Sequence, residues 1–118
     1  MRGKDAVGRY GEDLAAAHLE RAGLQVLTRN WRCALGELDI VALDGECLVV
    51  VEVKTRRSLA FGHPAEAVTW AKQARLRQLA AQWLRESTQP YPQVRIDVVA
   101  ILWPRGGPAQ LQHLRGVC

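Results

Sequence analysis

Residues 36–55 read GELDIVALDGECLVVVEVKT, and this stretch decides how the rest of the chain is interpreted. Two apolar runs rich in β-branched residues flank the dipeptide Asp44-Gly45. Such a dipeptide is typical of a two-residue hairpin turn, because a type I′ turn needs positive φ at both central positions. We therefore predict two antiparallel strands over residues 36–43 and 46–55.

Charged side chains interrupt the apolar pattern of both predicted strands. Counting outward from the turn places Leu43 opposite Glu46 and Asp39 opposite Val50, and opposed residues share one face of a sheet. That shared face carries four charged side chains: Glu37, Asp39, Glu52 and Lys54. In this register Asp39 and Glu52 are diagonal neighbours, with Cα atoms about 7–8 Å apart. The two carboxylates can therefore converge on one small ion.

The chemistry of this set favours a hard divalent cation. Carboxylate oxygens suit Mg²⁺ or Mn²⁺, and clustered carboxylates repel one another without a cation. Lys54 adds a point charge that can orient a water or steady a pentavalent phosphate, which indicates hydrolysis of a phosphodiester. The alternative is a salt-bridge cluster on a solvated face. The apolar run at residues 48–51 favours the metal site, because buried charge is costly unless it is paired or metal-bound.

The remaining pattern predicts one α/β domain over residues 1–118, with a mixed sheet flanked by helices and a core over about residues 5–103. Apolar periodicity predicts helices over residues 6–22 and 65–87, strands over 24–28 and 94–103, and a loop over 56–64. Gly23 is a plausible C-terminal cap of the first helix. Residues 104–118 are either a tail or a short edge strand near 111–114.

Composition narrows the function classes. The net charge of +4 favours an anionic partner, nucleic acid first, although a merely basic soluble protein fits the charge equally well. We expect no membrane span and no signal peptide, because no apolar run approaches the roughly 20 residues of a span. The odd cysteine count (Cys33, Cys47 and Cys118) predicts free thiols and a cytoplasmic location.

Several basic and aromatic residues are candidates for nucleic-acid contact. Arg56, Arg57 and His63 directly follow the second strand and are placed to meet phosphates, unless they form an ordinary solvated loop. The second helix carries Lys72, Arg75 and Arg77, as a basic track or as a common helix surface. Of the four tryptophans, Trp31 beside Arg32 is the one we expect to contact nucleic acid. We expect Asp97 to pair with Arg95 or with backbone.

A series of motifs in order along nearly the whole chain resembles the YraN family of small bacterial proteins. They are G-R-x-G-E at residues 8–12, A-A-A-H-L at 15–19, N-W-R at 30–32, G-E-L-D at 36–39, V-E-V-K-T-R at 51–56, F-G-x-P at 61–64, K-Q-x-R-L at 72–76 and R-I-D-V-V at 95–99. Asp39 followed by Glu52-Val53-Lys54 also resembles the pattern of PD-(D/E)XK nucleases, which include the Holliday junction resolvases. The resemblance implies a restriction-endonuclease-like core.

The resemblance also implies roles for individual residues. Asp39 and Glu52 would hold Mg²⁺ or Mn²⁺ together with the carbonyl of Val53, and Lys54 would serve the water. Glu12 matches a helix carboxylate of resolvase-like nucleases and would join the catalytic set. Glu37, Lys72 and Gln73 would support the site, and Arg56, Arg57, His63 and Arg75 would contact nucleic acid.

Together these implications predict a divalent-metal-dependent endonuclease that acts on DNA, with branched DNA as one substrate class. Branched DNA has twofold symmetry, so a junction enzyme would be expected to form a homodimer. Two alternatives stay open: a non-catalytic nucleic-acid-binding module with a nuclease fold, and a structural or adaptor protein whose carboxylates form salt bridges.

Overall fold

A five-stranded mixed sheet with a helix on each face forms the protein, which we describe from a computed structural model covering residues 5–60 and 62–117. Its elements are α1 (Ala6–Arg21), β1 (Gln25–Cys33), β2 (Gly36–Asp44), β3 (Cys47–Arg56), the 3₁₀ helix η1 (Pro64–Ala67), α2 (Trp70–Glu86), β4 (Gln93–Leu102) and β5 (Gln110–Leu114). The strands lie in the order β1-β2-β3-β4-β5. All neighbours are antiparallel except β3 and β4, which are parallel. The predicted α/β class is confirmed.

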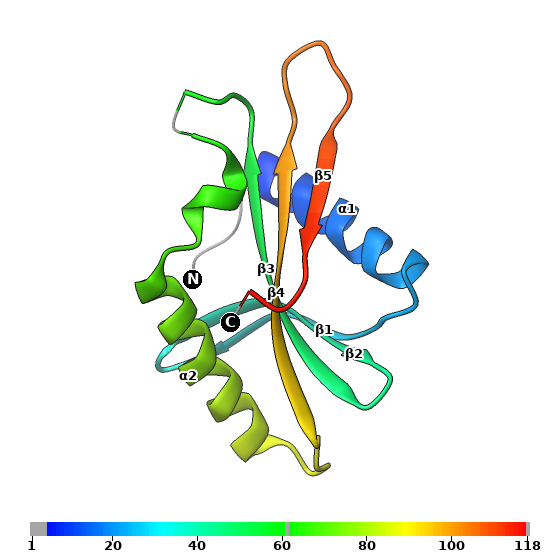
Figure 1. The fold of residues 1–118 in the computed structure, drawn as a ribbon, viewed down its shortest axis with the longest axis vertical. Coiled ribbons are helices and arrows are strands. Elements are labelled where there is room, and N and C mark those ends of the chain that lie inside the picture. Colours follow the sequence, from blue (N-terminus) through cyan, green and yellow to red (C-terminus); the bar gives the residue numbers. More distant parts are fainter. Residues whose placement is uncertain (1–4, 61, 118) are drawn as a thin grey trace.

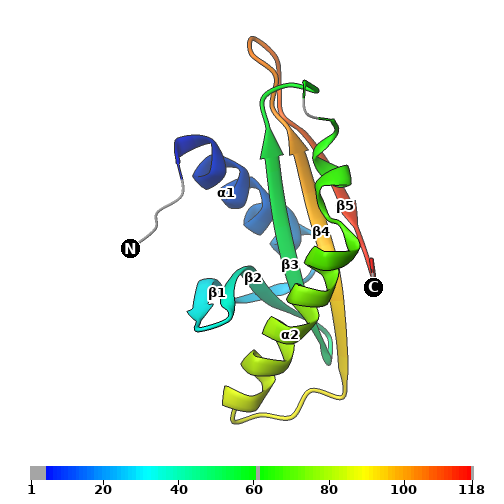
Figure 2. The ribbon, with the colours of Figure 1, turned by 90° about the vertical axis from the view of Figure 1, so that its left-hand side faces the viewer.

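The two helices cover opposite faces of the sheet, with α1 on one side of β3 and α2 on the other (Figures 1 and 2). Each face has its own apolar core. The α1 side buries Ala15, Leu19, Ile40, Val49, Val51, Val99 and Ile101, among others. The α2 side buries Leu38, Val41, Leu48, Val50, Leu76, Leu79 and Ile96, among others. Because successive strand residues alternate between these cores, residues 48–51 are apolar throughout, as a central strand requires.

The helix boundaries follow local capping. The Asp5 carboxylate accepts the Gly8 N–H at 2.7 Å to begin α1, and Gly23 with φ +94° follows its end, as predicted. The predicted start of the second helix at residue 65 is wrong. Pro64–Ala67 is a separate 3₁₀ turn, and α2 begins at Trp70, where the Thr69 hydroxyl caps the helix.

The β2–β3 hairpin differs from the predicted pairing. Asp44 pairs with Cys47, so Gly45 and Glu46 form the turn and the predicted opposition of Leu43 and Glu46 is wrong. Gly45 has φ +62° and Glu46 does not have positive φ, which is the sign pattern of a type II′ turn rather than type I′. The register therefore shifts by two residues. An even shift leaves every side chain on its predicted face.

The other strands extend or confirm the predictions. Strand β1 continues through Trp31 to Cys33, past a bulge near Leu27 and an unusual positive φ of 55° at Asn30. Residues 110–114 form the edge strand β5, so this part of the chain is not a tail. Cys33 and Cys47 are free thiols as predicted, whereas Cys118 and Phe61 of the F-G-x-P motif lie outside the described residues. None of the helices described is long and apolar enough to cross a membrane.

Helix α1 approaches β3 unusually closely. A Cβ placed on Gly11 would overlap the Thr55 hydroxyl, so only glycine lets the helix lie directly on this strand. The contact lies beside the end of β3, where Thr55 also contributes to the wall of a cleft. The packing of α1 therefore fixes the position of the strand end that carries the predicted site.

Candidate functional site

A cleft of about 830 Å³ lies between the start of α1 and the first turns of α2, beside the end of β3. Its walls come from the start of α1, the start of β2, the end of β3 and the first turns of α2. The charged residues that line it are Asp5, Glu37, Asp39, Glu52, Lys54, Lys72 and Arg75. The structure thus brings together the strand residues that the sequence placed on one face, and it adds basic residues from α2.

Asp39 and Glu52 form the acidic centre of this cleft. The β2–β3 ladder ends at the pair Ile40–Val51, so Asp39 and Glu52 are the next residue on each strand and are nearer to direct opposition than the predicted register implied. Asp39 is 8% exposed, and its Oδ2 accepts the Val53 N–H at 2.8 Å. Burial raises the pKa of Glu52 to about 7, and the charge of Asp39 and a hydrogen bond with it add to this rise. The two carboxylates therefore share one poorly solvated space.

Two lysines face this acidic pair. The Lys54 ammonium lies 3.5 Å from Glu52 Oε2, and Lys72 approaches it from α2. A hydrogen-bond contact with Lys54, followed by partial burial, lowers the pKa of Lys72. Both lysines act to lower the pKa of Glu52, yet burial and Asp39 outweigh them. Burial, more than any imbalance of charge, therefore keeps the pKa of Glu52 raised in this cleft.

The donor set in the cleft fits a hard divalent cation. Asp39 and Glu52 supply carboxylate oxygens, and the N–H of Val53 points toward Asp39. The carbonyl of a strand residue points to the same edge as its N–H, so Val53 directs a third oxygen toward this pair. Mg²⁺ and Mn²⁺ sites commonly combine one or two carboxylates with waters and substrate oxygens. In the part of the chain that the structure describes, no group of three His, Cys, Asp or Glu side chains is arranged to hold a metal.

Of three further predicted site residues, Glu37 lines the cleft, and Glu12 and Gln73 do not. Glu37 lines the cleft, and its Oε2 accepts Arg32 Nε at 2.9 Å. Glu12 is 1% exposed, but it lies against β1, where Arg29 Nε and Asn30 Nδ2 donate to its Oε1 at 2.9 and 3.0 Å. Glu12 is not among the residues that line the cleft, and neither is Gln73.

The predicted nucleic-acid contacts fall into two groups. Arg75 lines the cleft, where one of its terminal amino groups donates to the Leu35 carbonyl at 2.9 Å and ties α2 to the β1–β2 turn. The loop residues have structural partners. Arg57 Nε donates to the Trp103 carbonyl at 2.8 Å and its guanidinium stacks on the Trp103 ring, and His63 Nδ1 accepts the Ala65 N–H. The Arg56 carbonyl accepts the Trp103 N–H, so this hydrogen bond uses the backbone of Arg56 and not its guanidinium.

Three of the four tryptophans pack against the cores, and Trp83 lies on the core face of its helix as predicted. Trp31 and Trp83 are half-buried against the α2-side core, and Trp103 stacks on Tyr10 with ring centroids 4.0 Å apart. Trp70, by contrast, is 80% exposed. On the helix Trp70 lies on the side away from Leu76 and Leu79, and this angle does not depend on where the helix begins. The spacing of these residues in the sequence was therefore enough to predict its exposure.

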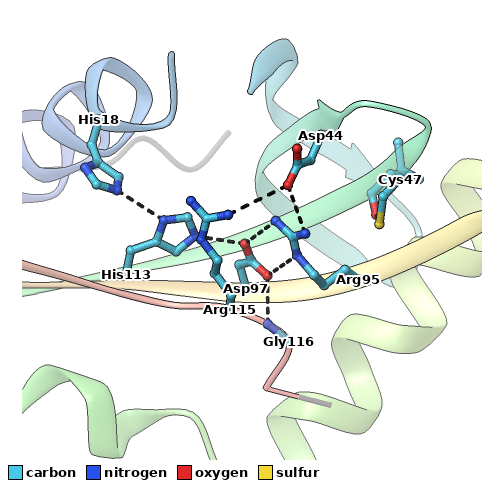
Figure 3. A network of polar contacts seen from close by, with 9 residues as sticks. His18, Asp44, Cys47, Arg95, Asp97, His113, Arg115 and Gly116 are labelled. Carbon is cyan, nitrogen blue, oxygen red and sulfur yellow. Dashed lines mark hydrogen bonds and ion pairs between the residues drawn. The ribbon is translucent and has the colours of Figure 1, made fainter. Parts of the chain in front are cut away.

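A second buried carboxylate, Asp97, lies on the α1 side of the sheet (Figure 3). Arg95 donates to both of its oxygens, as the sequence predicted, and His113 and the Gly116 N–H add contacts at 2.8 and 2.9 Å. His18 of α1 contacts His113 in turn, with 3.1 Å between Nε2 and Nδ1. Burial alone would raise the pKa of Asp97, but the hydrogen bonds from Arg95, Gly116 and His113 hold it below its usual value.

The fold and the cleft are compatible with one known class of α/β protein. A mixed five-stranded sheet with two helices is compatible with the restriction-endonuclease-like fold, and the acidic pair and Lys54 lie on adjacent central strands. Residues 11–101 match the family described as "Uncharacterised protein family UPF0102". The chain belongs to this family, also called the YraN family, which confirms the resemblance seen in the sequence.

Relatives named UPF0102 protein match the chain over nearly its full length. The protein of Beutenbergia cavernae is 64% identical over 117 residues, covering 99% of both chains. The protein of Arthrobacter sp. (strain FB24) is 56% identical, again over 99% of both chains. The protein of Kineococcus radiotolerans is 56% identical over 99% of this chain and 97% of its own. The family assignment therefore covers the whole described fold.

Proposed function

We propose that the protein is a divalent-metal-dependent endonuclease that hydrolyses phosphodiester bonds in DNA. One observation carries the proposal: Asp39 and Glu52 lie together in an open cleft with Lys54 and Lys72, and burial and the charge of Asp39 raise the pKa of Glu52 to about 7. Buried groups with strongly raised pKa values in a cleft are typical of functional sites. A metal-dependent nuclease needs acidic side chains that bind the metal ion and a positively charged side chain beside them.

The raised pKa of Glu52 favours this function over a purely structural salt-bridge cluster. In a structural cluster, lysine contacts should keep Glu52 ionised at its ordinary pKa or below. Instead the pKa of Glu52 rises to about 7 despite an ammonium 3.5 Å away. Two carboxylates in one buried space are stable as anions when a cation joins them. The raised pKa therefore favours a role of Asp39 and Glu52 in binding a cation over a role in stabilising the fold.

Each residue of the cleft then has a chemical role. Asp39, Glu52 and the Val53 carbonyl would hold Mg²⁺ or Mn²⁺, which when bound supplies Lewis-acid chemistry at a phosphate oxygen. The Val53 N–H fixes the orientation of the Asp39 carboxylate. Lys54 is placed to orient an attacking water and to stabilise negative charge that develops on the phosphate. Lys72 and Arg75 provide positive charge on the opposite wall, where the phosphate backbone of a strand would lie.

The test is cleavage of labelled DNA by purified protein in Mg²⁺, Mn²⁺ or EDTA. The substrates are a four-way junction, a duplex and a single strand of matched sequence. We expect metal-dependent cleavage that falls by at least about 100-fold in Asp39→Asn and in Lys54→Ala, because one such group is commonly worth that much. Asp13→Asn is the control, since Asp13 is an exposed acid on α1 outside the cleft.

Each outcome separates the candidates. Full activity in Lys54→Ala would contradict the assignment of the site. Metal-independent DNA binding without any cleavage would instead support the second candidate, a nucleic-acid-binding module that has a nuclease fold and no turnover. Thermal unfolding of each variant shows that a loss of activity is not a loss of fold.

A further inference from the structure

Three side chains from different parts of the chain form a stack at the end of the sheet where β3 and β4 finish. The Arg57 guanidinium lies 4.2 Å from the centre of the Trp103 ring, and the centroid of the Tyr10 ring lies 4.0 Å from that of Trp103. Trp103 is itself partly buried against the α1-side core. Its ring is therefore already packed and offers little open face on which a base could stack.

Hydrogen bonds fix the position of Arg57 in this stack. Its Nε donates to the Trp103 carbonyl at 2.8 Å, and the Trp103 N–H donates to the Arg56 carbonyl, also at 2.8 Å. Among the described residues, the guanidinium of Arg57 has contacts with Trp103 and no acidic partner, so its terminal amino groups are open to an anion. An arginine that is oriented in advance loses less conformational freedom when it binds a ligand.

The chain around the stack is basic. Arg57 directly follows β3, and Arg105 is exposed in the connection between β4 and β5. Arg105 is two residues from Trp103, so their Cα atoms lie within about 7 Å of each other. The connections after β3 and after β4 leave the sheet at the same end (Figure 1). The sequence has no Asp or Glu over residues 53–65 or 98–118, so this end of the sheet fits an extended anion.

This basic end of the sheet adjoins the cleft. Thr55 lines the cleft, and Arg57 follows it by two residues, so their Cα atoms are within about 7 Å. Helix α1 contributes to both places, because Val7 and Gly8 line the cleft and Tyr10 joins the stack. The stack itself does not line the cleft. It is therefore placed to contact DNA that extends out of the cleft, away from the cleaved position.

We propose that Arg57 and Arg105 bind the phosphate backbone of a DNA duplex beside the cleft, with Trp103 and Tyr10 as the rigid support of Arg57. This inference rests on the proposed nuclease function and specifies a substrate with a double-stranded segment next to the cleaved position. Proteins that hold single strands commonly stack bases on open aromatic rings, whereas the Trp103 ring is occupied. Guanidinium groups bind backbone phosphates whatever the base sequence.

The test measures DNA binding by the full chain in EDTA, where no metal-dependent cleavage occurs. Fluorescence anisotropy compares a labelled duplex of about 20 base pairs with its labelled single strand, over a salt series from about 50 to 200 mM. The variants are Arg57→Ala, Arg105→Ala and the double variant. The matched control is Arg85→Ala, which removes one positive charge from the last turn of α2, at the other end of the molecule (Figure 1).

We expect each single variant to weaken duplex binding by roughly 3- to 10-fold, and to reduce the slope of log K against log salt by about 0.9, the value for one phosphate contact. The double variant should reduce this slope by about 1.8. The wild type should bind the duplex at least as tightly as the single strand, and Arg85→Ala should keep the wild-type slope. Because Arg105 is exposed, Arg105→Ala tests the inference even where the loss of the Trp103 contacts unfolds Arg57→Ala.

Two results would overturn the inference alone. Unchanged affinity and slope in Arg105→Ala and in folded Arg57→Ala would show that this surface does not meet DNA, while cleavage in Mg²⁺ or Mn²⁺ would leave the proposed nuclease intact. A wild type that binds the single strand more tightly than the duplex would remove the duplex as the partner of this surface. If the wild type neither binds nor cleaves either DNA form, the proposed function itself fails.

Discussion

Two buried acidic clusters lie on opposite faces of adjacent strands, and they are treated differently by their surroundings. Val51 of β3 pairs with Asp97 of β4, and the next pair joins Glu52 with Val98. Asp97 faces α1, where Arg95, His113 and the Gly116 N–H satisfy it (Figure 3). Glu52 faces the cleft, where burial and then Asp39 raise its pKa and Lys54 only partly compensates.

The contrast separates charge that stabilises the fold from charge that, under the proposed function, binds a metal ion. The partners of Asp97 come from β4, β5 and the segment after β5, so this carboxylate joins the C-terminal part of the chain to the sheet. Removing one partner of such a buried network leaves uncompensated charge. Ionised Glu52 instead costs stability, because its pKa is raised on folding.

Replacing Asp97 should have the largest effect on stability. Asp97→Asn leaves Arg95 without its buried counter-charge, so we expect the free energy of unfolding to fall by about 3–5 kcal/mol. Urea denaturation followed by circular dichroism measures the loss. Asp13→Asn, at an acid whose side chain is 69% exposed, should change stability by less than about 0.5 kcal/mol. A fall of under 1 kcal/mol in Asp97→Asn would remove the structural role assigned to this cluster.

Replacing Glu52 should raise the stability, whereas replacing Asp97 lowers it. The pKa of Glu52 rises from 4.5 to about 7 on folding, so its contribution to stability is present below pH 4.5 and is lost as the pH rises through 7. In EDTA at pH 8, Glu52→Gln should therefore be more stable than the wild type by roughly 1–3 kcal/mol. At pH 4.5 the two proteins should be nearly equal. A variant that is destabilised at pH 8 would show that Glu52 serves the fold.

Calorimetry with Mn²⁺ tests the same contrast by measuring metal binding directly. We expect Asp39→Asn and Glu52→Gln each to weaken Mn²⁺ binding by at least about tenfold, because each removes one anionic oxygen donor. The control is Asp44→Asn, which alters an acid paired with Arg95 near the Asp97 cluster. Mn²⁺ binding that persists in both cleft variants would place the ion elsewhere.

The smallest expected effect concerns His18, which reaches the Asp97 cluster through His113. Burial, then the charges of His113, Arg21 and Arg115, lower the pKa of His18 below 6.5. Its contribution to stability is therefore present above pH 6.5 and is lost as the pH falls through its lowered pKa. We expect His18→Gln to flatten the pH dependence of Tm in this range by a few degrees at most. An unchanged profile would exclude His18 from the network.

The sequence was sufficient to place the cleft residues on one face, even though the predicted turn was wrong. The predicted and observed registers differ by two residues, and side-chain direction depends only on whether such a shift is odd or even. The convergence of Asp39 and Glu52 could therefore be predicted. Lys72 was expected near the site from family resemblance, and the structure places it on the opposite wall of the cleft.

Other features depend on contacts that leave no local pattern. His113 was missed as the partner of Asp97 because 16 residues and a chain reversal separate them, and only the β4–β5 pairing brings them together. The predicted start of α2 at residue 65 was wrong because Pro64–Ala67 forms a separate 3₁₀ turn ahead of the helix. Trp31 was expected at the surface, but an extended β1 carries it against the core.

The hydrogen-bonded pairing of β3 with β4 limits where residues can be inserted into or deleted from this chain. One residue inserted within β4 upstream of Arg95 would exchange the faces of its alternating residues. Arg95 and Asp97 would then enter the α2-side core, and Ile96 would lose its place there. Insertions and deletions should therefore accumulate in the connections after β3 (residues 57–60 and 62–69) and after β4 (residues 103–109), which lie at the same end of the sheet (Figure 1). Strands β3 and β4 should keep a constant length wherever both acidic clusters are retained.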